Sequence, residues 1–193
     1  MPLAKKTAKK YTYRDYLSWD DGSRLELIDG AVYDMTPAPS REHQELSMTL
    51  SLMIGNALKG HRCKIYAAPF DVRLPDKGEA DGNIVTVVQP DIVVVCDPKK
   101  LDDRGCRGAP DLVIEITSPA TASKDMKEKL ALYEKHGVKE YWIVHPGDKT
   151  IMIFRIGKNR EYGRPSVFVP GDTAKSAVVK TIAINVDEVF GVR

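Results

Sequence analysis

The sequence predicts an α/β fold built of layers, on the evidence of two kinds of apolar pattern. The runs DIVVV (91–95) and DLVIEI (111–116) are almost continuously apolar, which is typical of strands covered on both faces. The stretches 41–59 and 122–136 instead place apolar residues at helical spacing. Strands mixed with long helices bury their apolar faces on one another, so an α/β layer architecture is expected.

The N-terminal part of the chain is expected to form a short helix, a hairpin and a long helix. A short helix is predicted at 11–19. The alternating segment 24–33 predicts a hairpin whose Asp-Gly pair supplies the positive φ of a tight turn. Ser40 is a good N-cap for the long helix that follows, and Gly60 should end that helix.

The rest of the chain is expected to hold most of the strands and a second long helix. The polar segment 75–83 is predicted to be a loop, and Gly137 should end the second helix. A weakly alternating C-terminal segment ends in a helical turn, DEVF. Strands are predicted at 64–74, 84–88 running into 91–95, 111–117, 140–145 and 151–156.

Length and composition predict one soluble domain. The chain has 193 residues and no repeat or linker, so we expect a single domain over 11–193 after a disordered basic tail at 1–10. Hydrophobic residues make up 42% and charged residues 29%, which is typical of a globular protein. No apolar run approaches the roughly 20 residues that span a bilayer. Because no apolar segment follows the N-terminal lysines, a cytoplasmic protein is expected.

The charge balance argues against tight, constitutive binding to nucleic acid. The net charge is +2, but the first ten residues carry four lysines and no acid. Without those lysines the body of the chain has a net charge of −2. A body that binds DNA constitutively would be expected to be basic.

The cysteines are expected to be reduced. Cys63, Cys96 and Cys106 show no paired spacing, and an odd number leaves one over. Cys63 and Cys96 lie in apolar runs, where a thiol behaves as a small hydrophobic side chain. The sequence therefore predicts neither a disulfide nor a zinc site.

Two carboxylates stand out in the apolar strands. Alternation places Glu115 on the same strand face as Val113, inside a strand that otherwise looks buried. Asp91 stands at the start of IVVV, and if the two strands are neighbours both acids can converge. A proton, a basic side chain or a metal must then neutralise them, and hard oxygen ligands suit Mg²⁺ or Mn²⁺. The alternative is that Asp91 caps its strand and Glu115 pairs with an arginine.

The second long helix places one lysine near these acids. Lys129 borders the apolar stripe formed by Met126, Leu130 and Tyr133, and Asp125 lies one turn earlier on the same edge. A lysine beside metal-binding carboxylates can orient an attacking water or stabilise developing charge. The alternative is a lysine that buries its stem and extends its ammonium into solvent.

Glu26 and His43 are further candidates. Glu26 alternates with Leu25 and Leu27 in the hairpin, and His43 faces inward in the first turn of the first long helix. Either could act as acid, base or water-holder in the same site. The alternative for His43 is an ordinary core histidine with its hydrogen bonds satisfied.

The chain combines several recognisable motifs: ELIDG, an inward histidine after a Pro/Ser breaker, QPDIVVV, PDLVIEITSP, D-x-x-x-K-x-x-x-Y and GVKEYWIVHP. Together they resemble the Uma-two family of candidate endonucleases, which belongs to the PD-(D/E)XK superfamily. The resemblance covers roughly residues 11–190. It implies a restriction-endonuclease-like fold, a central mixed sheet flanked by helices, with a metal-dependent phosphodiesterase site.

Position by position, the resemblance assigns roles to the candidates. Asp91 corresponds to the acid of the PD motif and Glu115 to the second acid. The lysine two residues after that acid is missing, because the position holds Thr117. Lys129 is its expected replacement, and Glu26 and His43 match a recurrent acid and histidine of the family.

The resulting hypothesis is Mg²⁺- or Mn²⁺-assisted hydrolysis of a nucleic-acid phosphodiester, with DNA as the expected substrate. Asp91 and Glu115 would hold the metal, Lys129 would stabilise transition-state charge, and Glu26 or His43 would help to move a proton. A homodimer is expected because cutting two strands calls for two sites. Two alternatives stay open: a non-catalytic module that binds nucleic acid or protein, and a chiefly structural oligomer.

Overall fold

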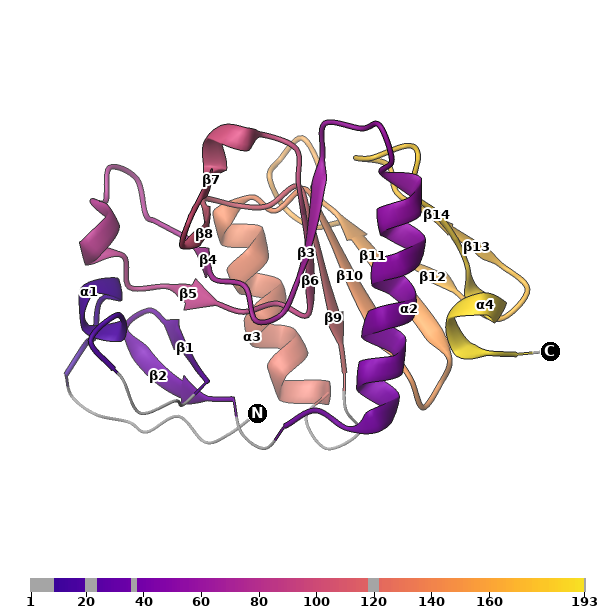
Figure 1. Cartoon of the computed structure of the whole chain (residues 1–193), viewed down its shortest axis with the longest axis horizontal. Helices are drawn as coiled ribbons and strands as arrows, with labels where there is room; N and C mark the ends of the chain where they lie inside the picture. Colours follow the sequence, from indigo (N-terminus) through magenta and orange to yellow (C-terminus); the bar gives the residue numbers. More distant parts are fainter. Residues whose placement is uncertain (1–8, 20–23, 36–37, 118–121, 193) are drawn as a thin grey trace.

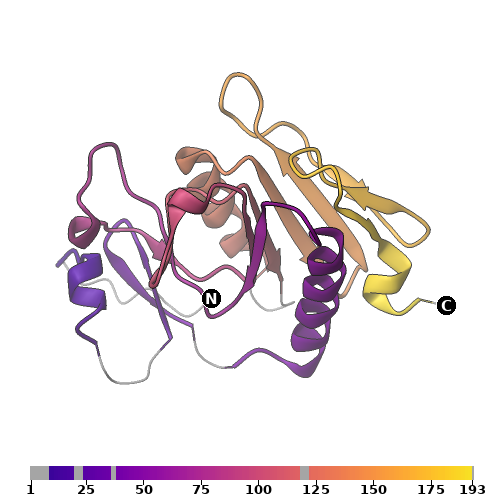
Figure 2. The same cartoon turned by 45° about the horizontal axis from the view of Figure 1, so that its top comes forward.

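The computed structural model describes residues 9–19, 24–35, 38–117 and 122–192, with the side chains of 122–126 outside the described part. Within these ranges the chain forms two six-stranded sheets, one two-stranded sheet and two long helices (Figure 1). The elements α1 (Tyr13–Tyr16), β1 (Leu25–Ile28) and β2 (Ala31–Asp34) lie at one end of the molecule, and α4 (Val186–Phe190), β13 (Thr173–Lys175) and β14 (Ala183–Asn185) at the other (Figure 2). The predicted α/β class is confirmed.

The larger core is built on a mixed central sheet in the order β12-β11-β10-β9-β6-β3. Only the β9–β10 pair is parallel among the pairings of these strands, and every other neighbouring pair is antiparallel. The bounds are β3 Lys64–Ala67, β6 Ile92–Val95, β9 Leu112–Ile116, β10 Glu140–His145, β11 Thr150–Arg155 and β12 Ser166–Phe168.

Two helices cover the two faces of this sheet, as the apolar runs predict. Helix α2 (Arg41–Ala57) packs its stripe Leu46, Leu50 and Ile54 against one set of strand residues, which includes Ile92 and Ile114. Ser40 caps this helix, as expected, by accepting a hydrogen bond from the backbone of residue 43.

Helix α3 (Ala122–His136) covers the opposite face. Leu132 and Tyr133 of this helix share a buried cluster with Val93 and Val113 of the sheet. Alternate residues of β6 and β9 therefore face different helices, which is why both strands are apolar throughout. No helix in the described ranges is long and apolar enough to cross a membrane.

The second six-stranded sheet is absent from the sequence prediction. Its order is β2-β1-β5-β4-β8-β7. The segment predicted as one strand at 64–74 is divided between β3 and β4, in different sheets, with Pro69 between them. The segments 84–88 and 91–95 also end up in different sheets, because Pro90 interrupts the backbone donors that a continuous strand needs. The bounds are β1 Leu25–Ile28, β2 Ala31–Asp34, β4 Val72–Arg73, β5 Val87–Val88, β7 Leu101–Asp102 and β8 Gly105–Arg107.

The ends of the chain are simpler. Helix α1 is shorter than predicted, and the predicted disordered tail falls largely on residues 1–8, outside the described part. Within that tail, Lys10 packs against Gly30 of the hairpin turn. The remaining elements are α1 Tyr13–Tyr16, two 3₁₀ turns at Asp81–Asn83 and Pro98–Lys100, β13 Thr173–Lys175, β14 Ala183–Asn185 and α4 Val186–Phe190.

The expectation of three reduced cysteines is wrong for two of them. Cys63 and Cys96 form a disulfide, whereas Cys106 is free and buried. The antiparallel register pairs Lys64 with Val95, so the two cysteines stand opposite each other just beyond these partners. Only strand pairing brings them together, and spacing along the chain gives no sign of it.

Asp111, which directly precedes β9, allows the pH dependence of stability to be tested. Its side chain is buried and accepts hydrogen bonds from Lys139 Nζ at 2.6 Å and Cys96 N at 2.7 Å. Burial would raise the pKa of Asp111, but these donors outweigh it and hold the pKa below its usual value. Asp111 therefore contributes to the free energy of unfolding. This contribution is fully present above the ordinary aspartate pKa of about 4, and it is lost as the pH falls through the lower pKa of the folded state.

Asp111→Asn should therefore make stability less sensitive to acid. We expect the free energy of unfolding of the wild type, from urea titrations at pH 6 and pH 3, to fall by about 1 kcal/mol more than that of the variant. Equal losses for both proteins would contradict this role. Asp187→Asn, at an exposed loop contact, is the control.

Candidate active site

Asp91 and Glu115 lie on neighbouring strands of the central sheet. Strands β6 and β9 are antiparallel, with Ile92 paired to Ile114 and Val93 paired to Val113. Asp91 directly precedes β6, so the same register places it opposite Glu115. Alternation from Val93 and Val113 assigns both acids to the sheet face covered by α3.

Lys129 reaches this face from α3 and neutralises Glu115. Its Nζ atom donates a hydrogen bond to Glu115 Oε1 at 2.8 Å and lies 3.4 Å from Glu26 Oε1. Tyr133, one helical turn later, donates its hydroxyl to the same Glu115 Oε1 at 2.7 Å. The buried acid is thus paired with a basic side chain, and the base is the predicted lysine rather than an arginine.

Glu26 belongs to the same cluster although it comes from the second sheet. It lies in β1 with 1% of its surface exposed, and its Oε1 accepts a hydrogen bond from the backbone N of Gln89 at 2.8 Å. The residue Gln89 stands two positions before Asp91. The link between β5 and β6 therefore ties the two acids to each other.

His43 completes the group through Asp91. Its Nε2 lies 3.1 Å from Asp91 Oδ2, and the same oxygen accepts a hydrogen bond from Ile116 N at 2.7 Å. Both side chains of the pair are partly open to solvent, with 17% and 18% of their surfaces exposed. His43 points inward, as predicted, and its partner is a candidate metal ligand.

The electrostatic environment keeps Lys129 and Tyr133, the two hydrogen-bond donors to Glu115, in the protonated forms that can donate. Burial raises the pKa of Glu115, the ammonium of Lys129 opposes that rise, and the charges of Asp91 and Glu26 add to it. Burial would lower the pKa of Lys129, but Glu115 and Glu26 outweigh it and keep the pKa well above its ordinary value. Burial also raises the pKa of Tyr133. Lys129 is therefore charged and Tyr133 protonated.

His43 has a higher affinity for a proton than free histidine. The hydrogen bond to Asp91 raises the pKa of His43, against the effect of burial. A histidine held in this way can take up or release a proton near neutral pH.

The three acids share a pattern that bears on metal binding. Glu115, Asp91 and Glu26 each accept protein hydrogen bonds through a single oxygen: Oε1, Oδ2 and Oε1 respectively. Within the described ranges, no protein hydrogen bond reaches the second oxygen of any of them. Those ranges also contain no set of three His, Cys, Asp or Glu side chains gathered closely enough to hold a metal ion. Two carboxylates suffice for Mg²⁺, which keeps several waters.

Three further residues need comment: one lies at the site without having been predicted there, and two do not take part in the contacts described. Tyr133 was assigned to the buried stripe and not to the chemistry, although its spacing of four residues from Lys129 is a usable signal. Asp125 lies where side chains are not described. Thr117, two residues after Glu115, contacts His145 Nδ1 at 3.0 Å.

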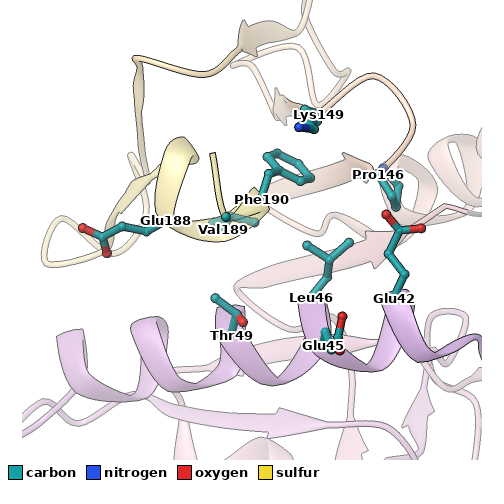
Figure 3. Close-up of a pocket in the computed structure, with 10 residues that line it drawn as sticks. Glu42, Glu45, Leu46, Thr49, Pro146, Lys149, Glu188, Val189 and Phe190 are labelled. Carbon is teal, nitrogen blue, oxygen red and sulfur yellow. The ribbon is translucent and has the colours of Figure 1, made fainter. Parts of the chain in front are cut away.

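A cavity of about 280 Å³ lies away from these residues. It is bordered by α2, the turn between β10 and β11, and α4. Figure 3 shows Glu42 and Leu46 on α2 extending toward Pro146 and Phe190. None of the predicted site residues lines this cavity.

With the fold and the acids placed, comparison with known proteins decides the family. Residues 13–187 match the model of the Uma2 family, which is described as "Putative restriction endonuclease". The chain belongs to the Uma2 family. The family assignment made from the motifs is therefore confirmed.

Two individual proteins extend the comparison of this Uma2 chain. It is 30% identical over 126 residues to "Uncharacterized protein slr1290" of Synechocystis sp., a match that spans 64% of this chain and 62% of that one. Its structure matches, with a TM-score of 0.73 and 18% identity, a protein of Anabaena variabilis titled "putative nuclease belonging to DUF820". That match covers 93% of this chain and 97% of the other. At this identity, the match establishes the shared fold.

Proposed function

We propose that this Uma2 protein is a divalent-metal-dependent nuclease that hydrolyses phosphodiester bonds. One observation supports this most strongly: Asp91, which directly precedes β6, stands opposite Glu115 of β9, and the ammonium of Lys129 lies beside both Glu115 and Glu26. Each acid uses one oxygen to hold its position and leaves the other without a protein partner in the described part of the chain. Carboxylate oxygens in this arrangement suit Mg²⁺ or Mn²⁺.

The ligands we propose are Asp91 and Glu115. A bound Mg²⁺ would polarise the phosphate and lower the pKa of a water molecule. Ile116 N and His43 orient Asp91, and Lys129 and Tyr133 orient Glu115, so neither carboxylate has to be immobilised when substrate binds. Hydrogen bonds to the ligand side chains of a metal site commonly provide such preorganisation.

The cationic and proton-carrying residues have separate roles. Lys129 stabilises the negative charge that develops on the phosphoryl oxygens. His43, partly open to solvent and bonded to Asp91, accepts a proton from the attacking water or passes one to the leaving oxygen. Glu26 holds Lys129 from the side of the second sheet.

The test is a cleavage assay on duplex DNA, single-stranded DNA and RNA with Mg²⁺, Mn²⁺ or EDTA. We expect metal-dependent cleavage by the wild type and a loss on the order of 10²-fold in Asp91→Asn and in Glu115→Gln. Glu161→Gln, an exposed glutamate elsewhere on the chain, is the matched control and should keep full activity. Cleavage that survives unchanged in both site variants would disprove the proposal.

A second candidate is a non-catalytic module that binds nucleic acid or protein. The net charge of −2 outside the first ten residues favours it, because a nuclease usually carries a basic face for its substrate. It predicts metal-independent binding with no cleavage in any buffer. The same assay, read together with a gel-shift measurement, separates the two functions.

We further propose that the nuclease acts in the cytoplasm as a homodimer, because two cuts in a duplex require two sites. Light scattering after gel filtration should give about twice the chain mass of 21.5 kDa. A single species at the chain mass would exclude the dimer and leave the cleavage chemistry unaffected.

A further inference from the structure

Two hydrogen-bond donors on α3 converge on a single oxygen of Glu115. Lys129 Nζ and Tyr133 OH reach Oε1 at 2.8 and 2.7 Å. They are four residues apart, so they stand on the same helix face, one turn above the other. The other oxygen, Oε2, receives no hydrogen bond from the described residues.

We propose that Tyr133 is a positioning residue that selects which oxygen of Glu115 is available to the metal. The proposal rests on the nuclease function proposed above. With Oε1 held by two donors, the carboxylate cannot rotate about its terminal bond without breaking both contacts. Oε2 is then the oxygen left to bind a cation.

Lys129 by itself does not define this orientation. Its ammonium is shared with Glu26, at 3.4 Å, and its flexible stem can follow Glu115 if the carboxylate turns. The Tyr133 ring, in contrast, is fully buried and packs edge-on against Tyr141, with the ring centres 4.9 Å apart. The hydroxyl of Tyr133 is therefore the fixed reference point for the carboxylate.

The shape of the site does not require a hydroxyl at this position. A phenylalanine would fill the same buried space and keep the contact with Tyr141. The hydrogen bond is the part of Tyr133 that packing leaves unexplained, which makes Tyr133→Phe a clean test.

The experiment is a titration of the metal-free protein with Mn²⁺, followed by calorimetry. The proteins are the wild type, Tyr133→Phe and the control Tyr162→Phe. Tyr162 is a partly buried tyrosine of the same aromatic cluster whose hydroxyl donates to Val138 O at 2.8 Å, away from the acids. We expect Tyr133→Phe to weaken Mn²⁺ binding on the order of tenfold and Tyr162→Phe to leave it unchanged.

A second pair of variants keeps the test independent of folding. Replacing Tyr133 with 4-aminophenylalanine retains a donor in the para position, whereas 4-methylphenylalanine has the same bulk and no donor. The amino variant should restore Mn²⁺ affinity and the methyl variant should not. Thermal melting without metal shows whether each variant is folded at the temperature of the titration.

The outcomes separate this proposal from the function on which it rests. If the wild type binds Mn²⁺ and the Phe and methyl variants bind it equally well, the positioning role is wrong and the nuclease proposal stands. If the wild type binds no Mn²⁺, the metal site itself is wrong and both proposals fall. Weaker binding in Tyr162→Phe as well would show a general packing effect and would also overturn the role of Tyr133.

Discussion

Replacing Lys129 with methionine is expected to slow cleavage strongly and to destabilise the fold. Glu26 and Glu115, with 1% and 12% of their side-chain surfaces exposed, would both lose the ammonium they share. Removing one partner of a buried pair typically costs about 3–5 kcal/mol, since a charge is left without compensation. The loss of charge stabilisation should also reduce the cleavage rate by about 10²–10³-fold.

The two effects are measured separately. Urea denaturation gives the free energy of unfolding, and the cleavage assay is run at a temperature where the variant is folded. Lys127→Met is the matched control, because Lys127 lies on the same helix with its side chain exposed. It should change stability by less than about 0.5 kcal/mol.

The cause can be tested by adding a second change. Without Lys129, Glu115 and Glu26 repel each other, so Lys129→Met combined with Glu115→Gln should recover part of the lost stability. Mn²⁺ should also stabilise Lys129→Met more than it stabilises the wild type, because a cation can replace the missing ammonium. A variant as stable as the wild type without metal would mean that the lysine is not what neutralises Glu115.

Replacing Glu140 with glutamine is expected to loosen the C-terminal segment. Glu140 is fully buried at the start of β10, where its carboxylate accepts hydrogen bonds from Ser176 Oγ at 2.7 Å and from Ala177 N and Val178 N at 3.1 and 3.2 Å. Arg155 Nε lies 3.3 Å away. One carboxylate thus holds the turn that leads into β14.

A neutral amide cannot serve all of these donors. Hydrogen bonds to charged groups contribute about 1.5–3 kcal/mol each, so weakening several of them should lower the free energy of unfolding by about 3 kcal/mol. Guanidinium denaturation of Glu140→Gln and the exposed control Glu161→Gln measures the difference. Amide exchange should rise first at residues 176–178. A loss below about 0.5 kcal/mol would show that the turn is held by its apolar neighbours.

Most residues of the candidate site were predicted from the periodic direction of side chains along strands and helices. The two-residue period of strands placed Glu115 on a defined face, and the 3.6-residue period of helices placed Lys129 at the border of a buried stripe. Their contact at 2.8 Å follows once the strand and the helix pack as neighbours. The family resemblance linked the same residues to Asp91 before any geometry was known.

Contacts between distant parts of the chain could not be found in this way. The hairpin that carries Glu26 was predicted, but its place beside Lys129 depends on a second sheet whose short strands carry almost no pattern. The pairing of Cys63 with Cys96 depends in the same way on the register of two strands. The contact of the Tyr133 hydroxyl with Glu115 was not predicted, because an apolar stripe explains a tyrosine without reference to its hydroxyl.

By itself, the sequence determined which faces of the strands and helices are apolar, and so the layers and the approach of Lys129 to Glu115. Only the tertiary structure decided where Glu26, His43 and the Tyr133 hydroxyl lie relative to those acids. The physical reason is that side-chain direction follows from local backbone geometry, whereas strand register and sheet membership depend on the packing of the whole chain.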